Sequence, residues 1–109
     1  MTAVLLLLQR ASAAVLALAV VVHLATIIYA VRGGLTAGEV LARTQGNAAY
    51  LVFYMLFVAA VAVHAPIGLR NVLREWLGWK GHACDGTLAV LALVLFALGV
   101  RAVTALYLA

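Results

Sequence analysis

Residues 48–76 read AAYLVFYMLFVAAVAVHAPIGLRNVLREW, and this stretch decides the fold. Between 48 and 69 it contains no acid and no strong base, and the titratable side chain deep inside it is His64. A run of about 20 apolar residues forms a helix long enough to cross the hydrocarbon core of a bilayer. The sequence therefore predicts a membrane-spanning helix over 48–69.

A polar stripe leaves this span at its C-terminal end. Positions i, i+4, i+7 and i+11 share one face of a helix, and here they hold His64, Gly68, Asn71 and Glu75. An ionisable side chain at membrane depth is costly, and it usually faces a protein interior, a cavity or a ligand. Gly68 adds no side chain one turn from His64, so this face has room for a large flat group.

The composition excludes a water-soluble globular domain. The chain has 109 residues, of which 69% are hydrophobic and 9% are charged, and its mean hydropathy is +1.23. These values are typical of a polytopic membrane protein, here a single domain over residues 1–109. The net charge of +4 would suggest nucleic-acid binding in a soluble chain, but these bases flank hydrophobic spans and act as topology signals. We expect no nucleic-acid partner.

Two further apolar segments complete the predicted fold class, an all-α membrane protein with three transmembrane helices. One covers about 11–31 and contains His23, and the other covers about 87–109 and contains Arg101. Residues 32–47 begin with two glycines, carry scattered charges and lack a long apolar run. They predict an interhelical loop at the surface, with room for one short helical turn.

The charged residues predict the orientation of the chain. Four bases lie on one side of the membrane: Arg10, Arg70, Arg74 and Lys80. Two lie on the other side, Arg32 and Arg43. Bases accumulate on the cytoplasmic side, so we expect a cytoplasmic N-terminus and a cytoplasmic connection over about 70–86.

Pro66 predicts a bend in the second span, and Cys84 lies in the predicted connection after it. Pro66 cannot donate to the carbonyl of Ala62, so we expect a bend in the helix there. Cys84 is the lone cysteine, and together with His82 it gives no complete set of metal ligands. We expect Cys84 to be a free thiol in a loop.

Two histidines within three spans suggest haem ligation, because imidazole is a common axial ligand of haem iron. Arg70 and Arg74 lie about two to three turns nearer the cytoplasm than His64, where they could neutralise haem propionates. A histidine in a membrane helix can also simply hydrogen-bond to a neighbouring helix, and bases at helix ends are commonly topology signals. The residues alone leave these two interpretations of His64 equal.

The run HAPIGLRNVLREW, residues 64–76, resembles the end of the second membrane helix in the cytochrome b anchor subunits of succinate dehydrogenases. That pattern has a haem histidine, a glycine four residues later, and then an acid with an aromatic residue. The residues QRAS at 9–12 are similar to the arginine and serine that approach the quinone in those subunits. Glu75 and Trp76 stand where relatives usually have aspartate and tyrosine, so an indole replaces a phenol. Gln9 stands where some relatives have histidine, which leaves open which of the two paired anchor subunits the chain resembles.

The resemblance implies a haem b-binding anchor of succinate dehydrogenase or fumarate reductase in a bacterial inner membrane. It would pass electrons between an iron–sulfur subunit, which also binds the flavoprotein subunit, and membrane quinone. His64 would be an axial ligand of the haem iron, and Gly68, Arg70 and Arg74 would lie around the porphyrin. Three helices cannot enclose a porphyrin, so the chain would form half of a heteromeric helix bundle, and a sister anchor subunit would supply the second axial ligand.

For the quinone we expect a site at the cytoplasmic interface, formed by Arg10, Ser12 and Trp76. Arg10 and Ser12 lie at the start of the first predicted span, and Trp76 follows the second. Arginine and tryptophan are also common interfacial anchors, and serine is common where membrane helices touch.

A second, distal haem is the minority interpretation. His23 lies about 12 Å below the far surface, and Arg101 reaches a similar depth, so a porphyrin with a propionate at Arg101 is geometrically possible. Dihaem relatives similarly carry one histidine on the first helix and another on the second. Against it, His23 could hydrogen-bond a carbonyl, and Arg101 could extend to the surface.

Two other classes of protein are alternatives to the cytochrome. The first is a haem-free structural membrane anchor of a similar complex, in which the histidines only pack. The second is a small multidrug-type or proton-coupled transporter, which needs a charge-coupling group inside the membrane, usually a carboxylate, and none of the three predicted spans contains an acid.

Overall fold

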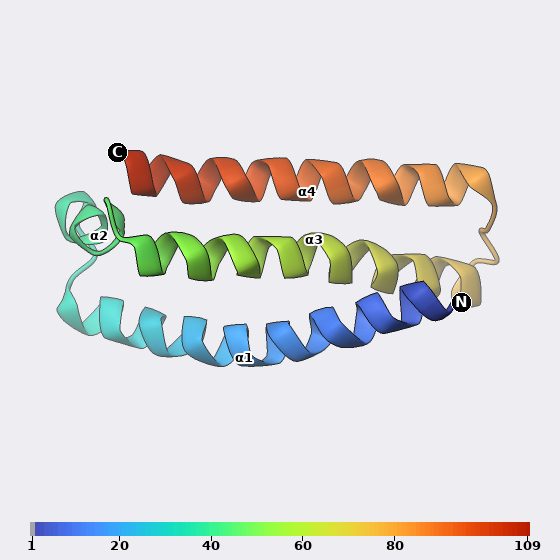
Figure 1. Cartoon of the computed structure of the whole chain (residues 1–109), viewed down its shortest axis with the longest axis horizontal. Coiled ribbons are helices and arrows are strands. Elements are labelled where there is room, and N and C mark those ends of the chain that lie inside the picture. The colour runs from blue at the N-terminus through green and yellow to red at the C-terminus, as the bar shows by residue number, and fades with distance from the viewer. Residues whose placement is uncertain (1) are drawn as a thin grey trace.

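The computed structural model describes residues 2–109, which form four helices and no strand (Figure 1). These are α1 (Ala3–Gly33), α2 (Ala37–Thr44), α3 (Ala48–Trp76) and α4 (His82–Leu108). The expectation of an all-α chain with three long apolar helices is confirmed.

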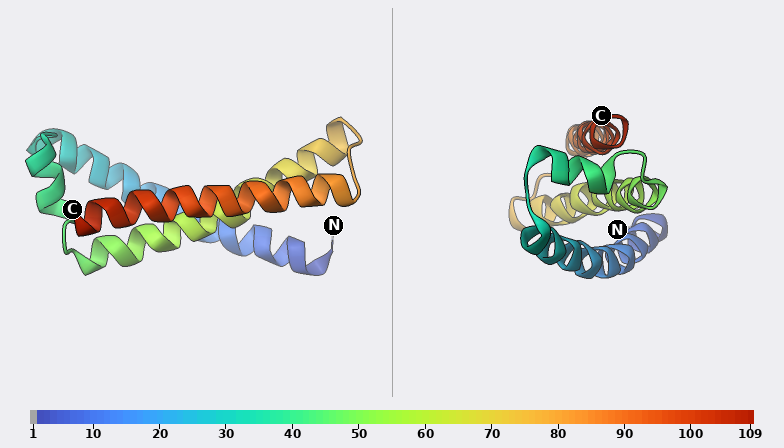
Figure 2. Two further views of the ribbon diagram at one scale, coloured as in Figure 1. Left: turned by 90° about the horizontal axis from the view of Figure 1, so that it is seen from above. Right: turned by 90° about the vertical axis from the view of Figure 1, so that its left-hand side faces the viewer.

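Helix α3 is the centre of the fold. It packs against α1 on one side and against α4 on the other (Figures 1 and 2). Each neighbouring pair runs antiparallel, and α1 crosses α3 obliquely in the view from above in Figure 2. Helix α3 thus lies between α1 and α4, and it is the one long helix with a long helix on each side.

The helices approach one another through small side chains. The buried residues of α3 include Ala60 and Ala62, and Ala19 of α1 is also buried. Gly99 of α4 lies so close to Val58 of α3 that a Cβ at Gly99 would overlap the Val58 side chain. Small residues at such contacts are the usual basis of helix association in membranes.

Helix α1 begins at Ala3, several residues before the predicted start near residue 11. Thr2 is its N-cap, and the Thr2 hydroxyl accepts a hydrogen bond from the backbone N–H of Leu5 at 3.3 Å. Such a cap satisfies one of the donors left open at a helix start. The apolar run after Thr2 therefore forms the first turns of the helix.

Helices α3 and α4 also exceed their predicted bounds, so the connection is shorter than the predicted 70–86. No glycine or proline interrupts α3 between Arg70 and Trp76, and the turn comes at Gly78 and Gly81, which have φ values of 66° and 103°. Glycine adopts such values without strain. The predicted loop position of Cys84 is wrong, because this residue lies in α4 and is fully buried, although it is a free cysteine as expected.

Helix α2 fills part of the predicted loop 32–47. The Thr36 hydroxyl accepts from the backbone N–H of Glu39 at 3.2 Å and donates to the Glu39 carboxylate at 2.6 Å. Thr44, at the last position of α2, is buried and donates to the carbonyl of Leu106 in α4 at 3.0 Å. The Thr36–Glu39 bonds cap the start of α2, and the Thr44–Leu106 bond ties its end to α4, so that α2 lies across the end of the three long helices (Figure 1).

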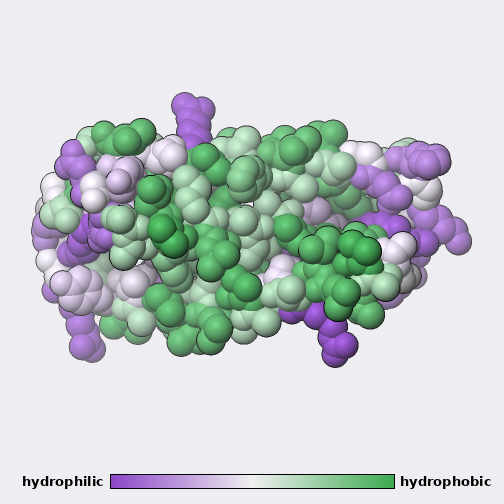
Figure 3. Space-filling view, in the orientation of Figure 1, coloured by the Kyte–Doolittle hydropathy of each residue, from purple (hydrophilic) through white to green (hydrophobic). Residues whose placement is uncertain are grey.

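Three helices, α1, α3 and α4, are each long and apolar enough to cross a membrane. The molecule is 48 Å long, close to the thickness of about 40–45 Å of a bilayer with its headgroups. Hydrophobic residues cover most of the visible face between the two ends in Figure 3, and hydrophilic residues gather toward the ends. The chain is thus a candidate small integral membrane protein with three spans.

Candidate functional site

The central polar contact between α1 and α3 joins Ser12 to His64. The Ser12 hydroxyl lies 3.3 Å from Nδ1 of His64, and Ser12 is one of the few buried polar residues of the described chain. The antiparallel packing of α1 on α3 brings these two residues together although 52 positions separate them. A residue expected at the quinone and a residue expected at the haem therefore form one cluster.

The hydrogen bonds of Ser12 favour one tautomer of His64. A serine hydroxyl has one proton and two lone pairs. The shorter contact of Ser12 Oγ is 3.1 Å, to the backbone carbonyl of Gln9, which can only accept. We therefore assign the Ser12 proton to that carbonyl, so that Oγ accepts from Nδ1–H of His64. In this tautomer the lone pair of His64 is on Nε2, the form in which histidine binds a metal.

Gly68 faces the same helix as His64 does. A Cβ at Gly68 would lie 3.3 Å from Nε2 of Gln9 on α1, so the Gln9 side chain occupies the space beside Gly68. The Oε1 atom of Gln9 is buried and has no hydrogen-bond partner within residues 2–109. An acceptor left in this way is costly, and it is a place where a further group can bind.

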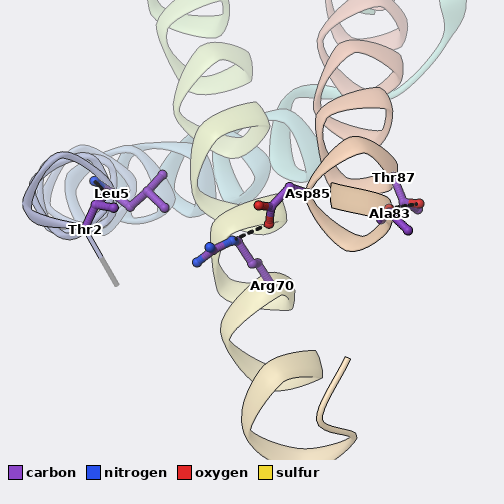
Figure 4. A network of polar contacts seen from close by, with 6 residues as sticks. All are labelled: Thr2, Leu5, Arg70, Ala83, Asp85 and Thr87. Carbon is purple, nitrogen blue, oxygen red and sulfur yellow. Dashed lines mark hydrogen bonds and ion pairs between the residues drawn. The ribbon is translucent and has the colours of Figure 1, made fainter. Parts of the chain in front are cut away.

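Arg70 is hydrogen-bonded to α4 and does not share the helix face of His64. Its Nε donates to Oδ1 of Asp85 at 2.8 Å, and Figure 4 shows the Asp85 side chain reaching from the start of α4 to Arg70 on α3. Six residues separate Arg70 from His64, which turns the two side chains about 120° apart on the helix. Nη1 of Arg70 is buried without a partner in the described chain, so a donor is still available. Arg74, one turn further on, is partly buried.

The three residues expected to form the quinone site do not form one cluster within the described chain. Ser12 is buried against His64, whereas Arg10 is exposed. Trp76 is 80% exposed, and it lies about 18 Å along α3 from His64, at 1.5 Å per residue. A site that uses both Ser12 and Trp76 would need a larger ligand or further residues between them.

His23 has partners that the sequence did not indicate. Its Nδ1 lies 2.8 Å from the hydroxyl of Tyr54 on α3, and its backbone carbonyl accepts from the Thr26 hydroxyl at 2.7 Å. The Thr26 and Tyr54 hydroxyls lie 3.2 Å apart. The ring of Phe57 also meets the imidazole edge to face, at 5.4 Å between centroids. His23 is therefore held in a polar and aromatic cluster between α1 and α3.

The two histidine clusters lie at different depths. Ser12 and His23 are separated by about 16 Å along α1, at 1.5 Å per residue, so His23 and His64 cannot bind the same iron. Arg101 is exposed on α4, which packs on the opposite side of α3 from α1 (Figure 1). Within residues 2–109, Arg101 is thus presented outward rather than toward His23.

Two cavities flank α3, and His64 lines neither of them. One of about 650 Å³ lies between α1, α2 and α3, with His23 and Tyr54 in its wall. The other, of about 430 Å³, extends from α1 to α4 over Pro66 and includes Arg70. In the described chain no group of three or more His, Cys, Asp or Glu residues could hold a metal ion. A metal centre at His64 would therefore need a further ligand from outside this part of the molecule.

Comparisons of the chain with protein-family models, with curated proteins and with solved structures found no match.

Proposed function

We propose that the chain is a haem b-binding membrane anchor subunit of a succinate dehydrogenase or fumarate reductase. Its role would be to pass electrons between an iron–sulfur subunit and membrane quinone, in a bacterial inner membrane with the N-terminus in the cytoplasm. The observation that carries the proposal is the Ser12–His64 contact, because it leaves the Nε2 lone pair of His64 available. The resemblance of residues 64–76 to haem-binding anchors agrees with it.

The residues around His64 fit a haem in part. Bound haem would supply reversible one-electron transfer by its iron. His64 would coordinate through Nε2, with Ser12 fixing the ring by the bond to Nδ1, as the hydrogen-bond partners of metal-bound histidines do. Because His64 lines neither of the two cavities beside α3, a sister anchor subunit would have to complete the pocket and supply the second axial ligand.

Two bases on α3 are candidates for binding the propionates. Arg70 retains a buried N–H group without a partner, although Asp85 occupies its Nε. Arg74 lies one turn nearer the end of the helix. A guanidinium can bind two acceptors at once, so Arg70 can hold Asp85 and a propionate together.

For the quinone, Ser12 has a second use. Its hydroxyl could turn from the Gln9 carbonyl to donate to a quinone oxygen while still accepting from His64. Arg10 and Trp76 are exposed and are free to contact a quinone bound between this chain and its partners. The iron–sulfur subunit, with the flavoprotein subunit beyond it, would dock on this same end of the molecule.

A haem-free structural anchor is the second candidate. The specific observation that favours it is that each membrane histidine already has a hydrogen-bond partner within the chain, Tyr54 for His23 and Ser12 for His64. A transporter is less well supported, since the three acids, Glu39, Glu75 and Asp85, lie in α2 or near helix ends.

A reduced-minus-oxidised optical spectrum of the purified complex separates the first two candidates. The proposal expects a b-type signal in proportion to the flavin. A complex that contains this chain, flavin and iron–sulfur centres at equal amounts but lacks the b-type signal would show a haem-free anchor instead.

A further inference from the structure

The larger cavity lies at the α2 end of the molecule, away from the Ser12–His64 contact. It has a volume of about 650 Å³, within the range of small-molecule sites in proteins. Its wall is formed by α1, α2 and α3 and is mostly apolar. A cavity of this kind in a membrane protein suits the hydrocarbon part of an amphiphile, provided that a polar group at its edge can bind the head.

Arg43 is such a group. It lies in the last turn of α2 and lines the cavity, and its guanidinium stands over the ring of Tyr29 at 5.7 Å. Its Nη2 donates to the backbone carbonyl of Gly34 at 2.8 Å. A guanidinium has five N–H groups, so this bond positions Arg43 and leaves donors for an anion. The described residues that line the cavity include no carboxylate, so its wall is positive.

Several other polar groups of the wall already have hydrogen-bond partners within the chain. The hydroxyl of Tyr54 bonds to His23, and Thr26 donates to the His23 carbonyl. The side chain of Asn47 donates to the Arg43 carbonyl and accepts from the backbone N–H of Tyr50. Among the described residues of the wall, Arg43 is the one strong base, so it is the group suited to bind an anion.

The position of α2 places Arg43 at headgroup depth. Helix α2 lies across the end of the three candidate spans (Figure 1), and it carries charged Glu39 and Arg43 beside apolar Val40 and Leu41. A short amphipathic helix in this position lies in the interface of a bilayer, where phosphate groups are. The positive charge of Arg43 at that depth favours an anionic lipid over a zwitterionic one.

We propose that the cavity between α1, α2 and α3 binds an anionic phospholipid. Its phosphate is held by Arg43, and one acyl chain enters the apolar part of the cavity toward His23 and Tyr54. The proposal needs the chain to be embedded in a membrane, but it does not depend on haem or quinone binding.

The test measures the association of spin-labelled phosphatidylglycerol and spin-labelled phosphatidylcholine with the purified protein in phosphatidylcholine vesicles. Arg43→Gln is compared with Arg32→Gln, a matched loss of charge in the last turn of α1 at a residue that is not part of the cavity wall. Arg43→Lys keeps the charge, and Ala30→Phe fills the cavity from α1. Circular dichroism checks that each variant keeps its helices.

We expect a preference for phosphatidylglycerol that falls roughly fivefold in Arg43→Gln and is largely kept in Arg43→Lys and Arg32→Gln. Ala30→Phe should reduce the binding of the labelled lipid, and millimolar inorganic phosphate should not displace it. An unchanged preference in a folded Arg43→Gln protein would overturn the proposal. So would an equal loss in Arg32→Gln, which would indicate surface charge alone, or displacement by phosphate, which would indicate a free-anion site.

Discussion

The Ser12 hydroxyl of α1 lies 3.3 Å from Nδ1 of His64 on α3, and the same hydroxyl lies 3.1 Å from the carbonyl of Gln9. This pair of contacts orients the imidazole and presents Nε2 as an acceptor. It also ties the first and third helices together at the level where the polar stripe of α3 begins. The proposed cytochrome function depends on this relationship.

Ser12→Ala removes the partner of Nδ1 and should loosen the His64 ring. We expect haem that is retained but bound less tightly, with a changed midpoint potential, and a loss of stability of about 0.5–1.5 kcal/mol. Ser12→Thr, which keeps a hydroxyl, should restore most of the haem affinity, the midpoint potential and the stability. Redox titration and the KM for quinone distinguish the roles of Ser12. A raised KM with an unchanged potential would mean that Ser12 serves the quinone and does not position His64.

Tyr54→Phe and His23→Ala test the second polar cluster. A double-mutant cycle of these changes should give a coupling energy of about 0.6–1.5 kcal/mol, because the 2.8 Å bond is lost in either variant. Unfolding in detergent supplies the free energies.

The haem-to-flavin ratio should be one and remain one in His23→Ala. A ratio near two that falls to one in that variant would establish the distal haem and reject the packing role.

Gly99→Ala should destabilise the contact between α3 and α4. A methyl group at Gly99 would overlap Val58, whereas one at Gly86, also on α4, would meet open space. We expect a loss of about 1–3 kcal/mol for Gly99→Ala, typical of overpacking. Gly86→Ala should be neutral or slightly stabilising, since alanine favours helix. Equal thermal stability of the two variants would contradict the close approach of the helices.

Arg70→Gln and Asp85→Asn separate two roles of the base at the end of α3. The Arg70–Asp85 pair is half exposed on the Asp85 side, at 52%, so water screens it and its loss alone should change the stability little. If Arg70 binds a propionate, Arg70→Gln should lower haem affinity several-fold, and Asp85→Asn should not. Haem titration of the apo complex measures this. Equal haem affinity in both variants would remove Arg70 from the haem site.

The long helices were predictable because their apolar runs leave few alternatives, but their ends were not. The bounds depend on local caps and turns, such as Thr2 at the start of α1 and Gly78 after α3. Helix α2 could have been found from its own sequence, since Thr36 and Glu39 have the spacing of a capping box. Its eight residues carry charges and lack a long apolar run, so the sequence indicated a loop with room for one short helical turn.

The pairing of residues between helices could not be predicted from the sequence. Ser12 and His64 were each singled out, but for separate sites, because nothing in one helix fixes its register against another. Once α1 and α3 run antiparallel with Ser12 opposite His64, His23 must lie near Tyr54. Tyr54 had looked like one aromatic residue among several in an apolar span. The exposure of Arg10 and Trp76 likewise depends on how the helices pack, which the sequence of each helix does not fix.

The most direct test of the proposed function compares His64→Ala with His82→Ala in the purified complex. His82 is the third histidine of the chain, and it is exposed at the start of α4, so it is a matched control. The measurement is the reduced-minus-oxidised optical spectrum, scaled to the flavin content. We expect the b-type signal to be lost in His64→Ala and kept in His82→Ala. A His64→Ala complex with its full haem content and an unchanged spectrum would contradict the assignment of His64 as an axial ligand.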